Sequence, residues 1–366
     1  MSELALKLIR ENIEKHERGE DAGFLDLGNC GITEVPEEIG ACVWLEDLSF
    51  ARGSFIWNGK EWQERKTQND GEPNNIASLP ESFFRLKNLK RLEICGNKDQ
   101  KFDFADLSVI ATMTSLQDLG FWHTQVSDLS PLASLTNLQD LDCSNTQVSD
   151  LTPLLNLTNL QRLSCSTIQV FDLTPLSGLT NMQSLNCSST QVSDLMPLAN
   201  LSKLLMLSCH RTQASDLSPL AKLTNLEELY CPHTLVSDLT PLAKLTKLRQ
   251  INCSSTQVSD LAPLANLTNL QELECYSTKV SDLAPLVNLK KLQKLDCDHS
   301  QVSDLTPLSG LTNLQSLYCS STQVSDLTPL SGLTISNTPL LTQVSDLMPL
   351  ANRAAVNTFM LRDTGV

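Results

Sequence analysis

The chain has 366 residues, 41% of them hydrophobic, which is enough to build a large buried core. Its formal net charge is -15, which argues against a nucleic-acid backbone or an anionic membrane as the main ligand, because both require clustered Lys and Arg. No apolar run approaches the roughly 18 residues of a membrane span and the first residues lack an apolar signal core, which predicts a soluble, non-secreted chain. Much of the acidity is one aspartate that recurs at Asp128, Asp150, Asp172, Asp194, Asp216, Asp238, Asp260, Asp282, Asp304, Asp326 and Asp346.

Residues 1–23 are predicted to form an N-terminal helical cap. Leu4, Leu8, Ile9 and Ile13 would share one face of an amphipathic helix, with Glu and Lys or Arg paired on the exposed side. Such a cap would cover the first of a series of repeats, because the end of a repeat array needs a polar cover.

Residues 24–115 read as degenerate repeats that are interrupted by an insertion at residues 51–73. The insertion contains Trp57 and Trp62, and irregular segments of this length in compact scaffolds are often functional. Two interpretations stay open: a flap that packs its indoles on the repeats, or an exposed loop that binds a partner through Trp57 and Trp62.

Residues 116–330 contain regular repeats with a period of 22, seen most simply in one file of cysteines. The file comprises Cys143, Cys165, Cys187, Cys209, Cys231, Cys253, Cys275, Cys297 and Cys319. This period and leucine spacing are the signature of leucine-rich repeats. They predict an α/β solenoid: a right-handed horseshoe with a parallel β-sheet on the concave face and short 3₁₀ or helical turns on the convex face.

Within each repeat, polar side chains are expected to satisfy backbone groups. A hydroxyl at Thr146 and its equivalents can bond turn backbone. Asp150 and its equivalents can cap the short turn that contains Pro153, so a calcium ladder is the weaker interpretation of this file. The cysteines are expected to be free buried thiols in a reducing compartment, since neither disulfide geometry nor zinc spacing is met.

Residues 331–366 read as irregular final repeats. The repeat near 332–344 is short and is either a hinge or a kink, and the frame then returns before the sequence stops in mid-repeat at Val366. Because solenoids seldom leave the last apolar layer open, we expect the native polypeptide to continue beyond Val366.

Candidate partner-binding residues are the large or charged side chains at the predicted concave face, where most repeats carry Ser, Asn or Gln. Aromatic and Arg side chains on such a bland surface are typical of an interface core, although a merely solvated face is the alternative. His210, His233 and Glu274 could be imagined as a metal or acid–base set, but we predict no catalytic, cofactor-binding or metal-binding residues. The partner-binding candidates are Trp122, His123, His210, Arg211, Tyr230, His233, Glu272, Glu274, Tyr276, Asp296, Asp298, His299 and Tyr318.

The 22-residue frame, with its Ser-Asp-Leu-x-Pro-Leu-x-x-Leu-Thr-Asn-Leu ending, resembles the internalin-like class of leucine-rich repeats, closely over residues 116–330 and loosely over 24–115. The segment Phe24-Leu-Asp-Leu-Gly-Asn-Cys-Gly-Ile-Thr-Glu-Val-Pro-Glu-Glu-Ile39, with the charged helix before it and the Trp-containing insertion after it, is similar to the start of a bacterial Roco protein. Roco proteins join such repeats to a Roc GTPase domain and a COR dimerisation domain.

The Roco resemblance implies that this chain is the regulatory arm of a cytoplasmic GTPase. The sequence departs from the family by lacking Gly-x-x-x-x-Gly-Lys-[Ser/Thr], so we expect no enzyme activity and no cofactor in this segment. GTP or GDP and Mg²⁺ would bind elsewhere in the parent, which would be a homodimer. The partners would be Roc and COR domains in cis or in trans, or another protein, with no nucleic acid and no membrane. The alternative function is a free-standing adaptor or effector that binds a protein.

Overall fold

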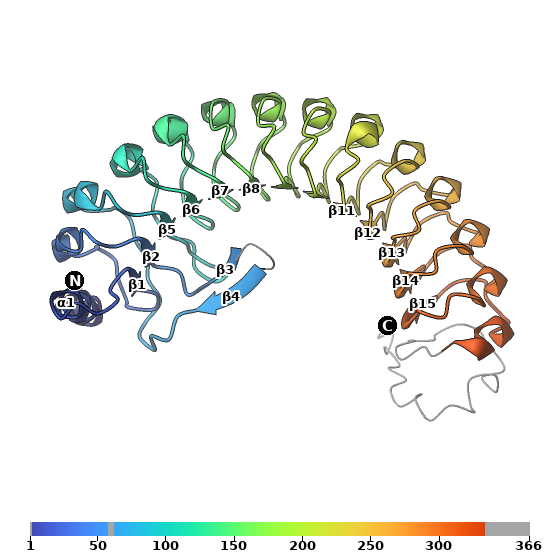
Figure 1. The fold of residues 1–366 in the computed structure, drawn as a ribbon, viewed down its shortest axis with the longest axis horizontal. Helices are drawn as coiled ribbons and strands as arrows, with labels where there is room; N and C mark the ends of the chain where they lie inside the picture. The colour runs from blue at the N-terminus through green and yellow to red at the C-terminus, as the bar shows by residue number, and fades with distance from the viewer. Residues whose placement is uncertain (1, 58–61, 334–366) are drawn as a thin grey trace. The chain divides into compact units, whose positions relative to one another are not determined.

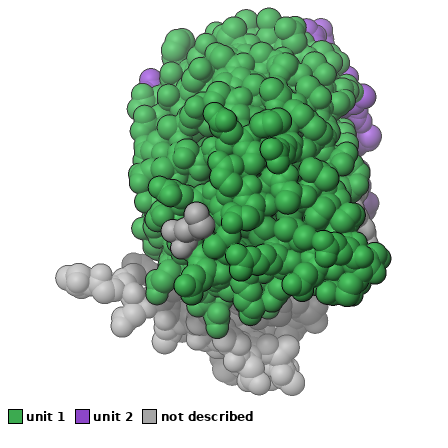
Figure 2. Space-filling view, turned by 90° about the vertical axis from the view of Figure 1, so that its left-hand side faces the viewer, with its two compact units in different colours: residues 1–186 green, residues 187–366 purple. Residues whose placement is uncertain are grey.

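The structure is a computed structural model that describes residues 2–57 and 62–333. The chain divides into two compact units, Met1–Asn186 and Cys187–Val366, which Figure 2 shows in different colours. Each unit is described by itself. In each, the strands line the inner side and the 3₁₀ helices line the outer side (Figure 1).

Unit 1 begins with helix α1 (Glu3–Glu17), and its repeats contribute parallel strands paired in register. The strands are β1 (Phe24–Asp26), β2 (Asp47–Ser49), β5 (Arg91–Glu93), β6 (Asp118–Gly120), β7 (Asp140–Asp142), β8 (Arg162–Ser164) and β9 (Ser184–Asn186). The 3₁₀ helices are η1 (Glu37–Ala41), η2 (Glu81–Arg85), η3 (Ser108–Thr112), η4 (Ser130–Ser134), η5 (Thr152–Leu154) and η6 (Thr174–Leu176).

Unit 2 repeats the same plan with nearly identical spacing, and its strands pair in parallel. Its strands are β10 (Met206–Ser208), β11 (Glu228–Tyr230), β12 (Gln250–Asn252), β13 (Glu272–Glu274), β14 (Lys294–Asp296) and β15 (Ser316–Tyr318). Its 3₁₀ helices are η7 (Met196–Leu198), η8 (Ser218–Lys222), η9 (Thr240–Leu242), η10 (Ala262–Leu264), η11 (Ala284–Leu286), η12 (Thr306–Leu308) and η13 (Thr328–Gly332). The predicted parallel sheet with 3₁₀ turns is confirmed.

The buried face of α1 differs from the expected one. Ala5, Ile9 and Asn12 are buried, whereas the predicted Leu4, Leu8 and Ile13 are half-buried. The Asn12 side-chain amide donates to the carbonyl of Ala22 at 3.1 Å and accepts from Trp44 Nε1 at 3.0 Å. A polar residue is buried here because it satisfies backbone at the edge of the first repeat, which apolar periodicity cannot indicate.

The insertion forms an antiparallel hairpin of β3 (Gly53–Trp57) and β4 (Trp62–Lys66). Trp57 pairs with Trp62 in its register, and the side chains of both tryptophans lie outside the described part of the structure. The hypothesis that they bind a partner therefore stays a prediction. The positions 334–366, which include most of the predicted irregular final repeats, also lie outside the described residues.

The core of a repeat consists of leucines and the cysteine file, all nearly inaccessible to solvent. All 12 cysteines of the sequence are free and buried. Burial raises the pKa of these thiols, to about 12 at Cys209 and at Cys253, because the apolar core disfavours the thiolate. The thiols therefore pack as small apolar groups.

Two polar files satisfy the backbone as predicted. Thr146 Oγ1 donates to the carbonyl of Cys143 at 2.7 Å, and the same bond recurs in later repeats, for example from Thr256 to Cys253 at 2.5 Å. Asp150 Oδ1 accepts from the Thr152 amide at 2.8 Å, where it precedes the N-cap residue of η5. Hydrogen bonds from the Thr152 side chain and from its amide lower the pKa of the Asp150 carboxyl.

The strands are short, and β7 ends at Asp142. Asn145 and its equivalents have a positive φ of 52–57° in the regular repeats, which turns the chain out of the extended conformation. Ser144, two residues after the end of β7, is 6% exposed, and its equivalents Ser188 and Ser254 are 0% exposed. The equivalent Ser166 and Ser320 are half-buried, so the exposure of this position varies between repeats.

Candidate interaction surface

The candidate site is the outward face of the strands, which we call the sheet face. In each three-residue strand the central Leu or Ile points into the core, so the first and third residues form two rows on the sheet face. In-register pairing places equivalent residues next to each other along each row, about 4.8 Å apart. The chemistry of the surface is therefore set by repeat positions that the core leaves free.

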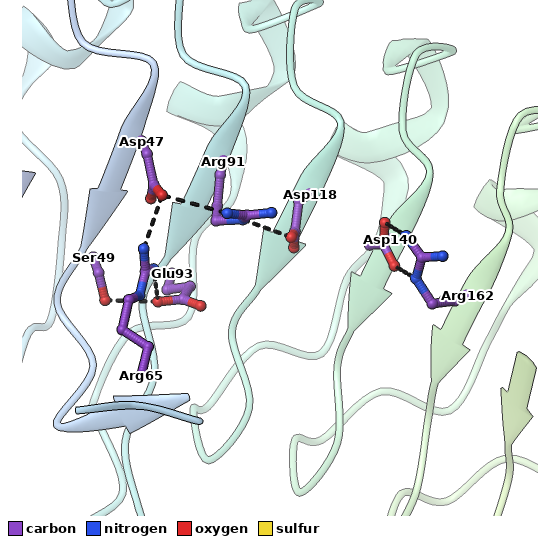
Figure 3. Close-up of polar contacts among 8 residues, drawn as sticks. All are labelled: Asp47, Ser49, Arg65, Arg91, Glu93, Asp118, Asp140 and Arg162. Atoms are coloured by element: carbon purple, nitrogen blue, oxygen red, sulfur yellow. Dashed lines mark hydrogen bonds and ion pairs between the residues drawn. The ribbon is translucent and has the colours of Figure 1, made fainter. Parts of the chain in front are cut away.

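In unit 1 the sheet face carries acids and arginines on neighbouring strands (Figure 3). Arg91 bridges Asp118 on one side at 2.7 Å and Asp47 on the other at 3.4 Å. Asp140 and Arg162 form a further pair with two hydrogen bonds. Opposite charges on adjacent strands stabilise these pairings, whereas Asp118 and Asp140 are like charges on paired strands.

The hairpin contributes a third arginine to this network. Arg65, from β4, extends to Asp47 at 2.8 Å and to Glu93 at 2.5 Å, while Ser49 donates to Glu93 at 2.7 Å (Figure 3). The Glu93 side chain is only 5% exposed. The Arg65 guanidinium also lies 4.8 Å from the centre of the Phe24 ring. These contacts fix the hairpin to the sheet face of unit 1.

Burial raises the pKa of three carboxyls on this face. Burial raises the pKa of Asp118 to about 6 despite its pairing with Arg91. It also raises the pKa of Asp140 and of Asp142, against the opposing effects of Arg162 and of the hydrogen bond from Ser144. These carboxyls therefore hold their protons more tightly than free aspartates do, even where an arginine lies beside them.

Unit 2 has a different sheet face, in which tyrosines and carboxylates predominate. Tyr230 donates from its hydroxyl to Glu228 at 3.0 Å and also contacts Gln250 Oε1 on the next strand. Glu274 accepts from Asn252 at 2.5 Å and forms an ion pair with Lys294. Burial and nearby glutamates raise the pKa of the Tyr230 hydroxyl, so it remains a hydrogen-bond donor.

Further along unit 2 the carboxylates gather without a nearby arginine among the described residues. Asp296 stands between Glu274 and Tyr318 in the register and accepts from the Asp298 amide at 3.1 Å. Burial raises the pKa of Asp296 to about 6, and repulsion from Asp298 and Glu274 adds to the effect. Asp298 itself accepts from the Ser320 amide at 2.5 Å.

The structure brings some predicted residues together and separates others. In unit 2, Tyr230, Glu272, Glu274, Asp296 and Tyr318 occupy the two strand rows and are half-buried. His210, Tyr276 and Asp298 follow the strands and are also half-buried. In unit 1, Trp122 and His123 follow β6 at the corresponding positions and are half-buried.

The histidines at this edge have a backbone reason for their position. His123, His233 and His299, together with Arg211, occupy the repeat position with positive φ, between 53° and 56°. Asn, Asp and His tolerate this left-handed conformation better than most residues. Their clustering therefore reflects turn geometry, and it is weaker evidence for an interface than the sequence indicated. His210, which lies outside this position, has its pKa lowered by burial, by Arg211 and by His233.

Sequence reasoning missed the acid–arginine network of unit 1. Asp47, Arg91, Asp118, Asp140 and Arg162 all occupy the first position of a strand, so the signal was an alternation of charge at one repeat position. The role of Arg65 in this network had no such signal in the sequence, because Arg65 belongs to an insertion outside the repeat.

The described residues show no group of three or more His, Cys, Asp and Glu side chains arranged to hold a metal ion. The helices in the described part of the chain are all too short or too polar to cross a bilayer. The sheet face thus presents hydrogen-bonding, ionic and aromatic groups on a rigid, regular support, which is suited to recognition of another molecule.

Comparison with known proteins identifies the class. A model of leucine-rich repeats (2 copies) matches residues 114–156, 224–266, 268–310 and 290–332. The structure is similar to an internalin, InlF, of Listeria monocytogenes, with 25% identity and a TM-score of 0.72 over 96% of this chain and 95% of that one. A comparison with curated protein sequences found no significant match.

Two further solved structures share the fold. A leucine-rich-repeat protein of Leptospira interrogans has 17% identity and a TM-score of 0.65, over 89% of this chain and 94% of that one. The plant peptide hormone receptor RGFR1, solved in complex with RGF2, has 18% identity and a TM-score of 0.56, over 84% of this chain and 61% of that one. The described residues therefore have the leucine-rich-repeat fold, which typically serves as a non-enzymatic interaction scaffold. Its repeats are of the internalin-like type.

Proposed function

We propose that this chain binds a protein partner through its sheet face. The observation that carries the proposal is the replacement of the usual small polar residues by Tyr230, Glu272, Glu274, Asp296 and Tyr318 on adjacent strands of unit 2. Aromatic side chains surrounded by polar groups are the usual anchors of protein interfaces. The peptide complex of the RGFR1 receptor shows that a similar solenoid can support such a role.

Site-specific photo-crosslinking tests this proposal. A benzophenone side chain in place of Tyr230 is expected to capture a protein partner in the native cell. The same group in place of Lys244, which is exposed outside the sheet face, is the matched control. Equal capture at the two positions, or capture at Lys244 alone, would show that the sheet face is not the binding surface.

We further propose that the parent protein is a cytoplasmic Roco-type GTPase of which this chain is the regulatory arm. The similarity of residues 24–39 to the start of bacterial Roco proteins and the twelve buried, free thiols support this proposal. GTP or GDP with Mg²⁺ would bind in the Roc domain of that parent, and its COR domain would hold a homodimer. The arm would contact Roc or COR domains in cis or in trans and bias their nucleotide-linked states.

The test is association of this chain with a separate Roc–COR protein. Substitution of Tyr230, Glu274 and Tyr276 by Ala is expected to weaken association without unfolding the chain. Unchanged association would exclude the sheet face of unit 2 as the contact.

The second candidate is a free-standing adaptor or effector. It is favoured by the similarity to InlF, which extends over 95% of that internalin structure. The same Roc–COR experiment separates the two candidates, because an adaptor of this kind would bind its own protein partner and would not associate with Roc–COR.

A further inference from the structure

The chemistry of the partner can be inferred from the charge on the sheet face of unit 2. The face between Tyr230 and Tyr318 contains the carboxylates of Glu228, Glu272, Glu274, Asp296 and Asp298. Among the described residues of its strands β11 to β15, the cation is Lys294, which pairs with Glu274. This excess of acid contrasts with unit 1, where Arg65, Arg91 and Arg162 neutralise the same repeat positions.

Apart from the ion pair of Glu274 with Lys294, the acids of this face are held by neutral groups. Gln250 approaches Glu272 at 3.5 Å, Asn252 donates to Glu274 and a backbone amide donates to Asp296. Burial, with added repulsion from Asp298 and Glu274, raises the pKa of Asp296. A set of charges that the fold itself disfavours is typical of a functional surface.

A buried hydroxyl provides a second, independent observation at the same place. Ser144 and Ser188 direct their hydroxyls to the serine on the next strand, at 2.7 Å for Ser164 and 2.8 Å for Ser208. Ser254 occupies the same repeat position and is 0% exposed, but Glu274 stands on its next strand.

Ser254 Oγ has no hydrogen-bond partner among the described residues. The equivalent hydroxyls of Ser144 and Ser188 contact the third residue of the next strand, and that position is Glu274 beside Ser254. A buried hydroxyl without a partner costs stability, so its hydrogen-bonding capacity is available when Glu274 moves.

We propose that the sheet face over β11 to β15 binds an extended, Lys- or Arg-bearing segment of a protein partner, with Glu272, Glu274 and Asp296 as its acidic contacts. This inference rests on the proposed protein-binding function and adds the class of partner. A cation from the segment replaces Lys294 beside Glu274, and the displaced carboxylate then accepts from Ser254. Tyr230 and Tyr318 flank the acids and offer ring faces to guanidinium groups.

The dimensions suit a short extended peptide. Tyr230 and Tyr318 are separated by four strand steps, which at about 4.8 Å each give about 19 Å. An extended chain rises about 3.3 Å per residue, so about six residues would cover the acids between the tyrosines. Alternate side chains of such a segment point the same way and are about 6.6 Å apart, so about three of them would face the acids.

The test uses labelled octapeptides of alternating Arg and Ser, with Glu–Ser and Gln–Ser peptides as controls, and measures fluorescence anisotropy with the full chain. We expect the Arg peptide to bind, with an affinity that falls as salt is added, and the Glu peptide not to bind. Spermine is included as a competitor, because it carries positive charge without a peptide backbone. Equal affinity for spermine and the Arg peptide would overturn the assignment of a protein segment.

Two variants, each with a matched control, place the site. E272Q/D296N is expected to lower the affinity for the Arg peptide about tenfold, because two partly buried charge pairs are lost. E34Q/E38Q changes the net charge equally at exposed positions in unit 1 and should change affinity less than about twofold. K294M removes the competing cation and should tighten binding about threefold, whereas K291M, an exposed lysine of the same repeat, should not.

S254A tests the role of the buried hydroxyl without endangering the fold. Because the hydroxyl has no hydrogen-bond partner among the described residues, its removal should leave stability unchanged or improved. The same substitution should lower the affinity for the Arg peptide about threefold. Similar weakening by E34Q/E38Q and E272Q/D296N, or binding of the Glu peptide, would overturn the proposal. If none of the three peptides binds while crosslinking at Tyr230 persists, the partner chemistry is wrong and the protein-binding function stands.

Discussion

The sheet faces of the two units use the same repeat positions and balance their charges in different ways. In unit 1 the carboxylates Asp47, Glu93 and Asp118 are paired with Arg65 and Arg91, and a hairpin lies against the strands (Figure 3). In unit 2 the corresponding rows carry tyrosines and acids, with Lys294 paired to Glu274. The repeat core fixes where side chains stand, and the free positions decide whether charges are satisfied within the chain or left for a partner.

The largest expected effect tests whether the two units share the same core. Leu141 in unit 1 and Leu229 in unit 2 are 2% and 0% exposed. Substitution of either by Ala should cost about 2–5 kcal/mol of unfolding free energy, because a cavity is left between repeats. Chemical denaturation measures the loss, and hydrogen exchange should show it mainly in neighbouring repeats. Uniform protection across either variant would contradict a one-dimensional array.

Loss of an ion pair should cost more stability in unit 1 than in unit 2. Arg65→Met leaves Glu93, which is 5% exposed, without its cation, and should cost about 3 kcal/mol and release the hairpin. Lys294→Met in unit 2 should cost less than about 1 kcal/mol, because the lysine side chain is 33% exposed. Chemical denaturation gives both values, and hydrogen exchange of β3 and β4 reports the hairpin. Equal costs would show that the charge networks do not differ as described.

The hydroxyl file should matter equally in both units. Thr256→Val removes the bond to the Cys253 carbonyl and leaves a buried acceptor, which should cost about 1–2 kcal/mol. Thr146→Val in unit 1 should give the same loss. Thr268→Val, at an exposed position, is the matched control and should stay within about 0.5 kcal/mol of the parent in thermal denaturation.

The smallest effect concerns pH and the acids of unit 2. The folded-state pKa of Asp296 is about 6, above its ordinary value of 3.8, so the native state holds this proton more tightly than the unfolded chain does. Stability from this group therefore falls as pH rises from about 4 to about 6. Asp296→Asn removes the penalty and should be more stable than the parent by about 1 kcal/mol or less above pH 6.

The pH dependence supplies its own control. Below the unfolded pKa both proteins carry a neutral side chain, so their unfolding free energies should converge. A variant that is less stable than the parent at pH 7, or equally different at every pH, would show that burial does not penalise this carboxylate.

Local and periodic features were predictable from sequence. The period of Cys143 and its successors gave the repeat, and the residue types at Thr146 and Asp150 predicted bonds that the structure contains. These interactions connect residues two or three positions apart. Their geometry is therefore contained in one repeat.

Features that depend on distant segments were not predictable. Asn12 is buried by contacts with Ala22 and Trp44, and Arg65 contacts strands on either side of its own insertion. The positive φ at His123, His233 and His299 is local, but sequence alone did not separate turn geometry from recognition. The candidate site was found at the level of the sheet face, and its division into paired and unpaired charges required the structure.

The most direct measurement is a carboxyl-carbon NMR titration of the full chain, labelled at Asp and Glu, with the alternating Arg–Ser peptide. Because the acids of unit 2 are open to a partner, the peptide should shift the carboxyl signals of Glu272, Glu274 and Asp296. The signals of Asp47, Glu93 and Asp118 should stay unchanged. Equal shifts in the two units, or shifts confined to unit 1, would contradict the distinction between a neutralised face and an open one.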